Sequence, residues 1–330
     1  MNPLQKRLMR AITGSPGDPN LDDLLARSDD LLAAAAPDPV HPSRDSRPRH
    51  TFSGGNPIEH MSARQIVRYL PRGVSEVASF LASMRAIRRF RPRIPRSDPA
   101  GLSEAIANEL RRLGAVEWGF AKIPSRAVFA GKAVPYPYAI VFSGPMDPAI
   151  LAKAPDFEVL REVAGAYGRV GKIANRLSRF IRDRGWNALP GHPLGGVVSY
   201  PILGQEAGLG WIGRSGMLIS PVRGPSQRVG VVYTDLSGLA FGSRPDHSWV
   251  SRFCASCGIC SRKCPVGAID PGGSTSEPAR FEPVDGDLCL PYFHAHWGCS
   301  VCVGFCPFTR TSYDTLKTSW ERRNLRPGGE

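Results

Sequence analysis

The chain has 330 residues, of which 42% are hydrophobic and 22% are charged, enough for one large or two modest globular units. Its N-terminus contains no apolar run long enough for a secretory signal or a membrane span, so we expect a cytoplasmic protein with no membrane span. The net charge of +13 is spread along the chain and favours acidic partners, either an electron donor such as ferredoxin or flavodoxin, or nucleic acid.

Residues 1–95 are rich in Pro, Ser, Asp and Arg, as in AAAAPDPVHPSRDSRPRH. Such a composition buries little apolar surface, so it predicts an extended or partly disordered arm. Short helices are expected within the arm at Leu21–Ala36 and Ala63–Tyr69. We assign this region no chemistry.

The pattern changes from Pro99 onward, where regular elements are predicted. LSEAIANELRRL, at Leu102–Leu113, has an apolar stripe at helical spacing. Val116–Ile123 and Tyr136–Phe142 are predicted strands, and the second is nearly all apolar, which favours a central place in a sheet. The strongest helical pattern is Leu160–Gly185.

One face of this long predicted helix is basic. The stripe consists of Arg169, Lys172, Arg176 and Arg179. A solvated helix face is the favoured interpretation, and the docking of an acidic electron donor or of RNA is the alternative.

Three further strands are predicted, at Val197–Ile202, Met217–Ser220 and Arg228–Thr234. Between the first two lies GQEAGLGWIGRSG, whose glycines match G-x-G-x-x-G. A dinucleotide-binding fingerprint follows a strand and opens a helix, whereas this one follows a short helix and runs into a strand. We therefore reject that assignment, although the bare backbone allows a large flat ligand to approach closely.

All eight cysteines lie between residues 254 and 306. The first four have the spacing C-x2-C-x2-C-x3-C-P of bacterial ferredoxins, in which three thiolates bind one [4Fe-4S] cluster and the fourth binds the other. The last four cysteines supply the reciprocal ligands. Crossing the ligands predicts one set of Cys254, Cys257, Cys260 and Cys306, and a second set of Cys264, Cys289, Cys299 and Cys302.

Two other kinds of site use closely spaced cysteines. C-x2-C pairs suit structural zinc, and an even number of cysteines suits a disulfide framework. The additional close cysteine and the C-P ending, which occurs twice, favour two [4Fe-4S] clusters. Cysteines confined to such a motif also indicate a reducing compartment.

Residues 99–308 resemble a known family. The block GHPLGGVVSYPILGQEAGLGWIGRSGMLISPVRGPSQRVGVVYTDL, followed by the eight cysteines and DLCLPYFHAHWGC, is similar to the cobalamin-dependent iron–sulfur reductases, which comprise reductive dehalogenases and epoxyqueuosine reductase. The resemblance implies a nitroreductase-like α/β core that binds a base-off corrinoid (cobalamin) beside the clusters. The implied cofactor contacts are Gly208, Leu209, Gly210, Trp211, Gly213, Arg214, Ser215 and Gly216.

The two branches of this family differ at the proton donor. Epoxyqueuosine reductases carry an Asp in a V-D-S-x-P segment, where this chain has Val198. Reductive dehalogenases use a tyrosine in the long helix and a basic residue after the I-T-P-x-x-G segment, and the matching residues are Tyr167 and Arg228. A guanidinium beside a phenol, whose ordinary pKa is about 10, favours proton donation. The alternative is a buried structural tyrosine and a surface arginine that pairs with a carboxylate.

Motifs and resemblance together predict an α/β (α+β) fold with four regions. They are a Pro- and Arg-rich arm (1–95), an α/β corrinoid- and substrate-binding domain (96–245), a ferredoxin-like domain with two [4Fe-4S] clusters (246–312) and a C-terminal tail (313–330). The favoured function is reductive removal of halide from a small organohalide, with electrons from ferredoxin or flavodoxin. An epoxyqueuosine reductase-like enzyme acting on tRNA and a non-catalytic iron–sulfur electron-transfer protein remain alternatives.

Overall fold

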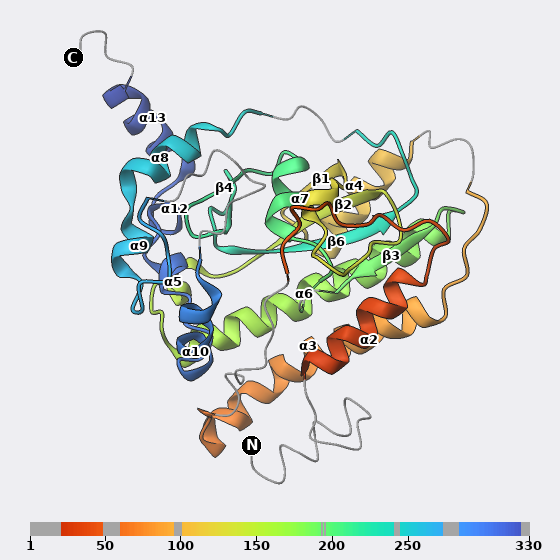
Figure 1. Ribbon diagram of the computed structural model, residues 1–330, viewed down its shortest axis with the longest axis horizontal. Coiled ribbons are helices and arrows are strands. Elements are labelled where there is room, and N and C mark those ends of the chain that lie inside the picture. Colours follow the sequence, from red (N-terminus) through yellow and green to blue (C-terminus); the bar gives the residue numbers. More distant parts are fainter. Residues whose placement is uncertain are drawn as a thin grey trace.

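The computed structural model describes residues 21–48, 60–95, 101–192, 194, 196–240, 245–272 and 284–324. An antiparallel four-stranded sheet with the order β1-β2-β6-β3 lies at the centre (Figure 1). Its strands are β1 Glu117–Lys122, β2 Tyr138–Pro145, β3 Ala188–Gly191 and β6 Gln227–Thr234. β4 Trp211–Ile212 and β5 Leu218–Ile219 form a separate small pair. β2 lies between β1 and β6, so the prediction of a central apolar strand is confirmed.

Helices cover both faces of the sheet and form the left-hand part of the molecule in Figure 1. Those of the first part are α2 Leu21–Ala33, α3 Ala63–Arg88, α4 Leu102–Leu113, α5 Pro148–Leu151, α6 Phe157–Arg182 and α7 Tyr200–Glu206, with a 3-10 turn at Ser125–Ala127. Those of the cysteine-rich part are α8 Trp249–Cys257, α9 Ile259–Lys263, α10 Gly286–Ala295, α11 Val301–Gly304, α12 Pro307–Arg310 and α13 Tyr313–Asn324. No helix in the described part of the chain is both long and apolar enough to cross a bilayer.

Alternate residues of each strand point to opposite sides of the sheet. Helices pack on both sides, so both faces of the sheet are buried. Ile140 and Phe142 of β2 face the layer formed by α4 and α6. Ala139 and Val141 face α7 and the ends of α2 and α3. The continuous apolar run of β2 therefore fills two cores, as its sequence predicts.

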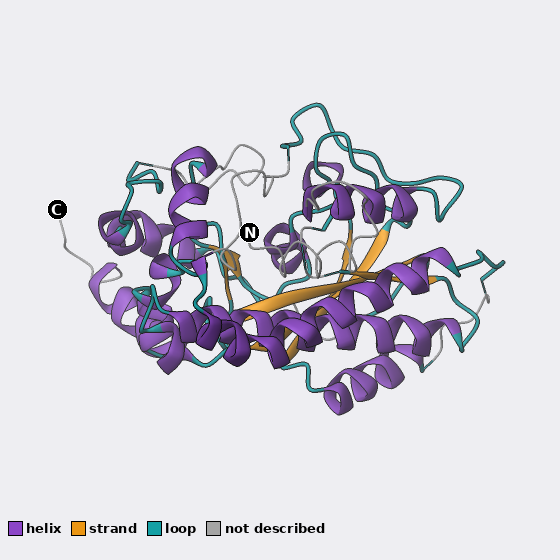
Figure 2. Cartoon of the chain, turned by 90° about the horizontal axis from the view of Figure 1, so that it is seen from below, coloured by secondary structure: helices purple, strands orange, loops and turns teal. Residues whose placement is uncertain are grey.

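Helix α3 contradicts the prediction for residues 1–95. A short helix was predicted at Ala63–Tyr69, whereas α3 runs from Ala63 to Arg88, 26 residues in all, and packs along α6 (Figure 2). It begins with a capping box, in which Ser62 and Gln65 bond each other's backbone amides. Phe80 is 2% exposed, so this part of the supposed arm belongs to the folded core. Residues 1–20, also assigned to the arm, lie outside the described residues.

The predicted strand Val197–Ile202 is also wrong. Val198 forms only an isolated bridge with Val128, and α7 begins at Tyr200. The strand that completes the sheet is β3, which the sequence analysis missed. β3 is an edge strand, and it contains Pro190, a residue that edge strands tolerate and that conceals a strand pattern.

The predicted tail 313–330 is helical in its described part. α13 packs against α8, where the indole Nε1 of Trp249 donates a 2.7 Å hydrogen bond to the Tyr313 hydroxyl. The same hydroxyl lies 2.9 Å from Nδ1 of His247. Tyr313 is 6% exposed, so α13 is part of the cysteine-rich half.

Candidate functional site

The eight cysteines converge in two groups. All eight are free thiols, which excludes the disulfide framework in this structure. Electrostatic interactions join each group's thiols, and one further interaction, between Cys260 and Cys302, joins the groups. The first set is Cys254, Cys257, Cys260 and Cys306; the second set is Cys264, Cys289, Cys299 and Cys302. The fold thus brings together the same residues that the crossed ferredoxin pattern pairs.

Burial dominates the chemistry of these thiols. It raises the pKa of Cys254 to about 11 and that of Cys302 to about 12. Burial alone therefore disfavours the thiolate, the form that binds metal, and a metal centre would offset that cost by supplying positive charge. Among the described residues, no group of three or more His, Cys, Asp or Glu side chains has the arrangement of a metal-ion site. The two sets are therefore defined by the mutual interaction of their thiols.

The turn that carries Cys299 has an uncommon backbone. Trp297, Cys299 and Ser300 have positive φ angles of 47°, 35° and 67°, and Gly298 between them has 78°. Non-glycine residues adopt this region at a cost of about 1–3 kcal/mol each, and such strain collects at functional sites. Successive amides in turns of this kind form concave sites that bind anionic groups, iron–sulfur clusters included. This geometry fits a cluster at the second set.

The glycine segment 208–216 lies against the first set. A Cβ on Gly213 would stand 3.6 Å from Sγ of Cys254, and one on Gly210 would stand 2.1 Å from the carbonyl oxygen of Ile219. At Gly210 a side chain would therefore collide with the Ile219 backbone, and at Gly213 it would collide with Cδ1 of Ile219, 2.5 Å away, while the distance to Cys254 is an ordinary contact. The segment joins the sheet domain to the cysteine-rich half.

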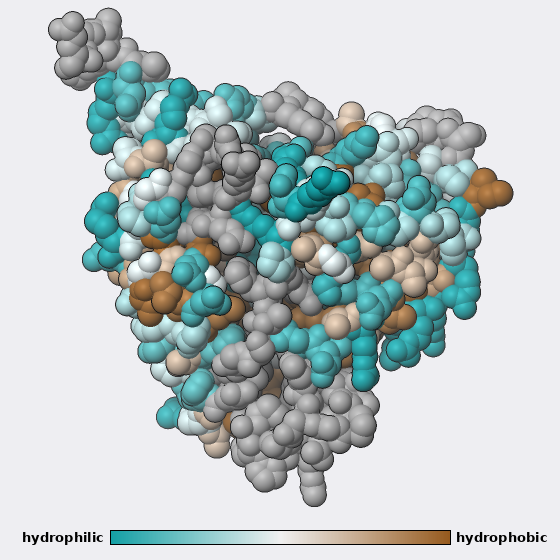
Figure 3. All heavy atoms as spheres, in the orientation of Figure 1, coloured by the Kyte–Doolittle hydropathy of each residue, from teal (hydrophilic) through white to brown (hydrophobic). Residues whose placement is uncertain are grey.

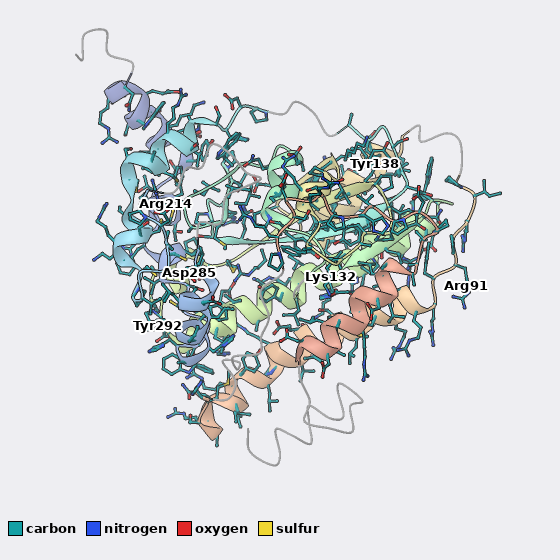
Figure 4. All side chains as sticks on the ribbon, in the orientation of Figure 1. Arg91, Lys132, Tyr138, Arg214, Asp285 and Tyr292 are labelled. Atoms are coloured by element: carbon teal, nitrogen blue, oxygen red, sulfur yellow. The ribbon has the colours of Figure 1, made fainter. Side chains whose placement is uncertain are left out.

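Arg214 has a definite role in this junction. Its buried guanidinium donates to the backbone carbonyls of Cys254, Ala255, Asp270 and Pro271. In Figure 4 it lies among the cysteine-bearing helices. These bonds hold the loop around the first set, and the corrinoid contact predicted for Arg214 stays a prediction.

Tyr167 and Arg228, the predicted proton donor and its basic neighbour, are brought together. The guanidinium carbon of Arg228, at the start of β6, lies 4.9 Å from the ring centroid of Tyr167 on α6. Tyr167 also packs in one apolar cluster with Cys299 and Cys302. Tyr167 and these two cysteines of the second set thus border the same apolar cluster, which includes Val163, Ala166 and Val301. The arrangement can stabilise negative charge on the phenol, since a cation lies over its ring.

The sequence analysis missed two residues of this site, Tyr69 and Glu76. The Tyr69 hydroxyl donates a 3.1 Å hydrogen bond to Oε2 of Glu76, two turns further along α3. Burial raises the pKa of Glu76 to about 7, although Tyr69 and the charge of Arg228 oppose the change. Burial and the Glu76 carboxylate also raise the pKa of Tyr69. The Glu76 carboxylate therefore interacts electrostatically with the guanidinium of Arg228, which lies beside Tyr167.

Gly168 of α6 allows α3 to approach closely enough to deliver Glu76, and Gly73, within α3 itself, leaves room for the ring of Tyr69. A Cβ on Gly168, next to Tyr167, would lie 2.7 Å from the hydroxyl oxygen of Ser75 and 3.3 Å from the amide nitrogen of Glu76. A Cβ on Gly73 would lie 2.4 Å from the ring of Tyr69. The capping box of α3 and the single carboxylate among its five arginines were signals that could have revealed the helix and Glu76.

Several buried donors near these elements have no hydrogen-bond partner within the described residues. They are Nε of Arg228, Nε1 of Trp211 and Nε1 of Trp297. Unpaired buried donors are costly, and a bound group with acceptor atoms would satisfy them. The amide-rich rim of a corrinoid carries acceptors of this kind, so the donor chemistry of these three residues is compatible with that cofactor.

Val198 is the residue that the sequence resemblance matches to the acid of the epoxyqueuosine reductases. It is 2% exposed and packs in the core with Val128 and Val197. The site therefore has no carboxylate at this position.

Comparisons with known proteins agree with these features. No protein-family model matches the chain. A tetrachloroethene reductive dehalogenase of Sulfurospirillum multivorans is 33% identical over 175 residues, which cover 50% of this chain and 34% of that protein. An epoxyqueuosine reductase of Francisella cf. novicida is 27% identical over 140 residues, which cover 37% of this chain and 35% of that protein. The chain thus spans about one third of the length of these relatives.

A solved structure has a similar fold. It is the catabolic reductive dehalogenase NpRdhA in complex with 3-bromo-4-hydroxybenzoic acid, with a TM-score of 0.58 and 25% identity. The match covers 68% of this chain and 34% of that chain. The mixed α/β architecture is therefore that of the reductive dehalogenase structures.

Proposed function

We propose that this chain, a homologue of the reductive dehalogenases and epoxyqueuosine reductases, is a corrinoid- and iron–sulfur-dependent reductase that removes halide from a small organohalide. The observation that carries the proposal is the position of the Arg228 guanidinium, 4.9 Å over the ring of Tyr167, a residue that borders the same apolar cluster as Cys299 and Cys302 of the second set. A proton donor and an electron conductor then adjoin one reaction space.

In this proposal the two cysteine sets each bind a [4Fe-4S] cluster, within a ferredoxin-like half, and the sheet domain is a nitroreductase-like core. The crossed grouping of the thiols supports the first part. The glycine segment and the unpaired donors of Trp211 and Trp297 support a corrinoid between the two halves. Bound there, a base-off corrinoid would supply a low-potential cobalt that accepts electrons and activates the carbon–halogen bond.

The overall change takes two electrons and one proton: the carbon–halogen bond breaks, halide leaves and a carbon–hydrogen bond forms. Tyr167 supplies the proton from its hydroxyl, and the Arg228 guanidinium stabilises the phenolate that remains. Glu76 holds Arg228 in place through charge, and Tyr69 fixes the carboxylate by its hydrogen bond. Tyr69 and Glu76 are positioning residues in this scheme.

Electrons enter the cysteine-rich half at a surface groove. A groove of about 400 Å³ is lined by Arg262, Lys263, Phe305 and Arg310. Arg262 bonds the carbonyl of Cys257, so the groove borders the first set, and Lys263 lies 5.3 Å from the Phe305 ring. Three cations line this groove, and two of them, Lys263 and Arg310, lie over the Phe305 ring, an arrangement that suits an acidic donor such as ferredoxin or flavodoxin. The path then leads from the groove through the first set to the second set and Tyr167.

Halide release tests the reaction. The chain is reconstituted anaerobically with iron, sulfide and cobalamin, reduced with titanium(III) citrate and given 3-bromo-4-hydroxybenzoic acid. We expect bromide and 4-hydroxybenzoic acid in equal amounts, and a loss of at least about 100-fold in rate for Tyr167→Phe, typical of removing a general acid. Tyr138→Phe is the matched control, since Tyr138 lies in β2 and stacks on Phe120.

Two results would overturn the proposal. If no member of a panel of aryl and alkyl halides is turned over while iron and cobalamin are bound and reducible, the chain is an electron-transfer protein. Equal rates for Tyr167→Phe and Tyr138→Phe would remove Tyr167 from the reaction. Conversion of epoxyqueuosine in a tRNA anticodon would assign the other branch, despite Val198.

The donor groove is tested separately. Lys263→Ala should slow reduction of the clusters by flavodoxin several-fold and leave reduction by titanium(III) citrate unchanged, because only the protein donor needs the groove. Lys122→Ala, on the exposed end of β1, removes the same charge elsewhere and is the control. Equal slowing in both variants would show that net charge alone attracts the donor.

A further inference from the structure

A pocket rich in arginines lies at the far end of α3 and α6 from the cysteines. Its volume is about 460 Å³, and no Asp or Glu occurs among its described lining residues. The arginines that line it are Arg85, Arg89, Arg91, Arg93, Arg179 and Arg182. In Figure 4, Arg91 marks the right-hand end of the molecule and Arg214 the cysteine-rich side. Helix α6, with 26 residues, spans about 39 Å between these ends.

The pocket is built on ordered backbone. The segment after α3 crosses the end of α6, where the amide of Arg93 donates to Oδ1 of Asn187 at 2.9 Å. Asn187, 4% exposed, returns a 2.7 Å hydrogen bond to the carbonyl of Arg93 and another of 2.6 Å to Asp235. Phe90 and Trp186, both mostly buried, form the apolar base. The chain direction is therefore fixed where the arginines emerge.

The positive charge of the pocket exceeds what helix ends require. Cations in the last turn of a helix interact favourably with its dipole, and that accounts for Arg85, Arg179 and Arg182. It extends to Arg89, the C-cap residue of α3, but it does not account for Arg91 and Arg93. Among the described residues, none of the six arginines forms an ion pair, and the hydrogen bonds of Arg91, Arg93 and Arg182 go to backbone carbonyls.

The arginines of the pocket also repel one another electrostatically. Burial lowers the pKa of Arg182, Asp183 opposes that change, and the charges of Arg179 and Arg93 lower it further. A bound anion would relieve this repulsion. Hydrophilic side chains line the lower part of the right-hand edge in Figure 3, and an apolar group lies above them at the outermost point.

We propose that this pocket binds a ligand that carries two or more adjacent phosphate groups. Guanidinium groups bind phosphate through two parallel hydrogen bonds, and several converging guanidiniums suit an oligophosphate. The volume of about 460 Å³ falls within the range of small-molecule sites, whereas nucleic acid backbones follow extended basic grooves. This binding site is separate from the proposed reductase chemistry and does not depend on it.

Titration calorimetry of the full chain with sodium tripolyphosphate tests the proposal. We expect one site with micromolar affinity and much weaker binding of sulfate. The double variant Arg89→Lys/Arg179→Lys keeps the charge and loses the planar fork, so affinity should fall at least tenfold. Arg322→Ala/Arg323→Ala, on exposed residues of α13, removes two positive charges elsewhere and should bind as the unchanged chain does.

Three outcomes would overturn it. Full binding by the lysine variant would mean that only charge matters, and equal loss in the α13 variant would mean that attraction is not local. A single-stranded RNA oligonucleotide that binds more tightly than tripolyphosphate, with Lys172→Ala/Arg176→Ala weakening it, would assign the basic face to nucleic acid. Because calorimetry needs no turnover, failure here leaves halide release unaffected, and loss of halide release leaves this site standing.

Discussion

The cysteine sets and the Tyr167 site are built from the sequence in different ways. All cysteines of both sets lie within residues 254–306, at spacings that are typical of cluster-binding motifs. The Tyr167 site instead combines α3, α6 and β6, which meet only through packing. A motif that is local in sequence can therefore be recognised residue by residue, whereas a site assembled by helix packing is recognised only in part.

The largest predicted effect concerns the crossing of the cysteine sets. Cys260→Ala/Cys264→Ala removes one ligand from each set, so it should lose both clusters and nearly all iron, from about eight atoms per chain. Cys264→Ala/Cys302→Ala removes two ligands from the second set alone. It should keep about four irons per chain, with the spectrum of one [4Fe-4S] cluster. Iron and sulfide analysis with EPR of the reduced protein measures both.

An uncrossed arrangement gives the opposite result. If Cys264 served the same cluster as Cys260, the first variant would keep about four irons and the second would lose all of them. The two double variants thus control each other, because each removes two thiols. Zinc in the purified chain, in place of iron, would contradict the cluster assignment itself.

Much of the fold could be predicted where a segment's own pattern decides its structure. α4 has the bounds predicted from its apolar stripe, and α6 and β6 differ from prediction by a few residues at their ends. α3 was underestimated because Pro71 and a basic, polar sequence resemble a loop, although packing on α6 carries the helix through them. Local composition does not contain that contact.

The candidate site shows the same division. Tyr167 and Arg228 were predicted by resemblance, and the structure places them in contact, while their catalytic role remains a prediction. Glu76 could not be found in this way, because its carboxylate acquires meaning only from burial beside Tyr69 and Arg228. Arg214, predicted as a cofactor contact, donates hydrogen bonds to backbone carbonyls that lie 40 or more residues away in sequence. Its local sequence does not indicate these partners.

Glu76→Gln tests whether the charge of Glu76 supports the reaction through Arg228. The amide keeps the shape and a hydrogen-bonding oxygen for Tyr69 but removes the charge that faces Arg228. We expect kcat for halide release to fall by about 10–100-fold, as for other groups that orient a reacting residue, with cobalamin binding unchanged. Glu104→Gln, on the exposed side of α4, is the control. Unchanged kcat in the Glu76 variant would reduce Glu76 to a structural residue.

The same variant predicts a pH dependence of stability. The pKa of Glu76 is about 7 in the folded chain against an ordinary 4.5, so the folded state holds this proton more tightly than the unfolded state. Its contribution is fully present below about pH 4.5 and is lost as the pH rises to about 7. Relative to Glu76→Gln, the free energy of unfolding should therefore fall by at most about 3 kcal/mol across this window.

Urea unfolding at pH 5 and pH 8 under anaerobic conditions measures that difference. Comparison with Glu76→Gln cancels the titration of other groups, the cysteines included. Parallel pH profiles for the two proteins would show that Glu76 is ionised in the fold at both pH values, and the assignment of its burial would be wrong.

The smallest expected effect concerns the helix contact that brings Glu76 to the site. Gly168→Ala places a methyl group 2.7 Å from Ser75, and relief of that clash should cost about 1–3 kcal/mol of unfolding free energy and lower kcat. Gly165→Ala, one turn earlier on α6, meets only arginine side-chain atoms at 3.4 Å, and these can move. Because alanine favours helix over glycine by about 1 kcal/mol, Gly165→Ala should be neutral or stabilising. Equal unfolding free energies and equal kcat values for the two variants would mean that α3 tolerates displacement from α6. Close packing at Gly168 would then not explain how Tyr69 and Glu76 are positioned.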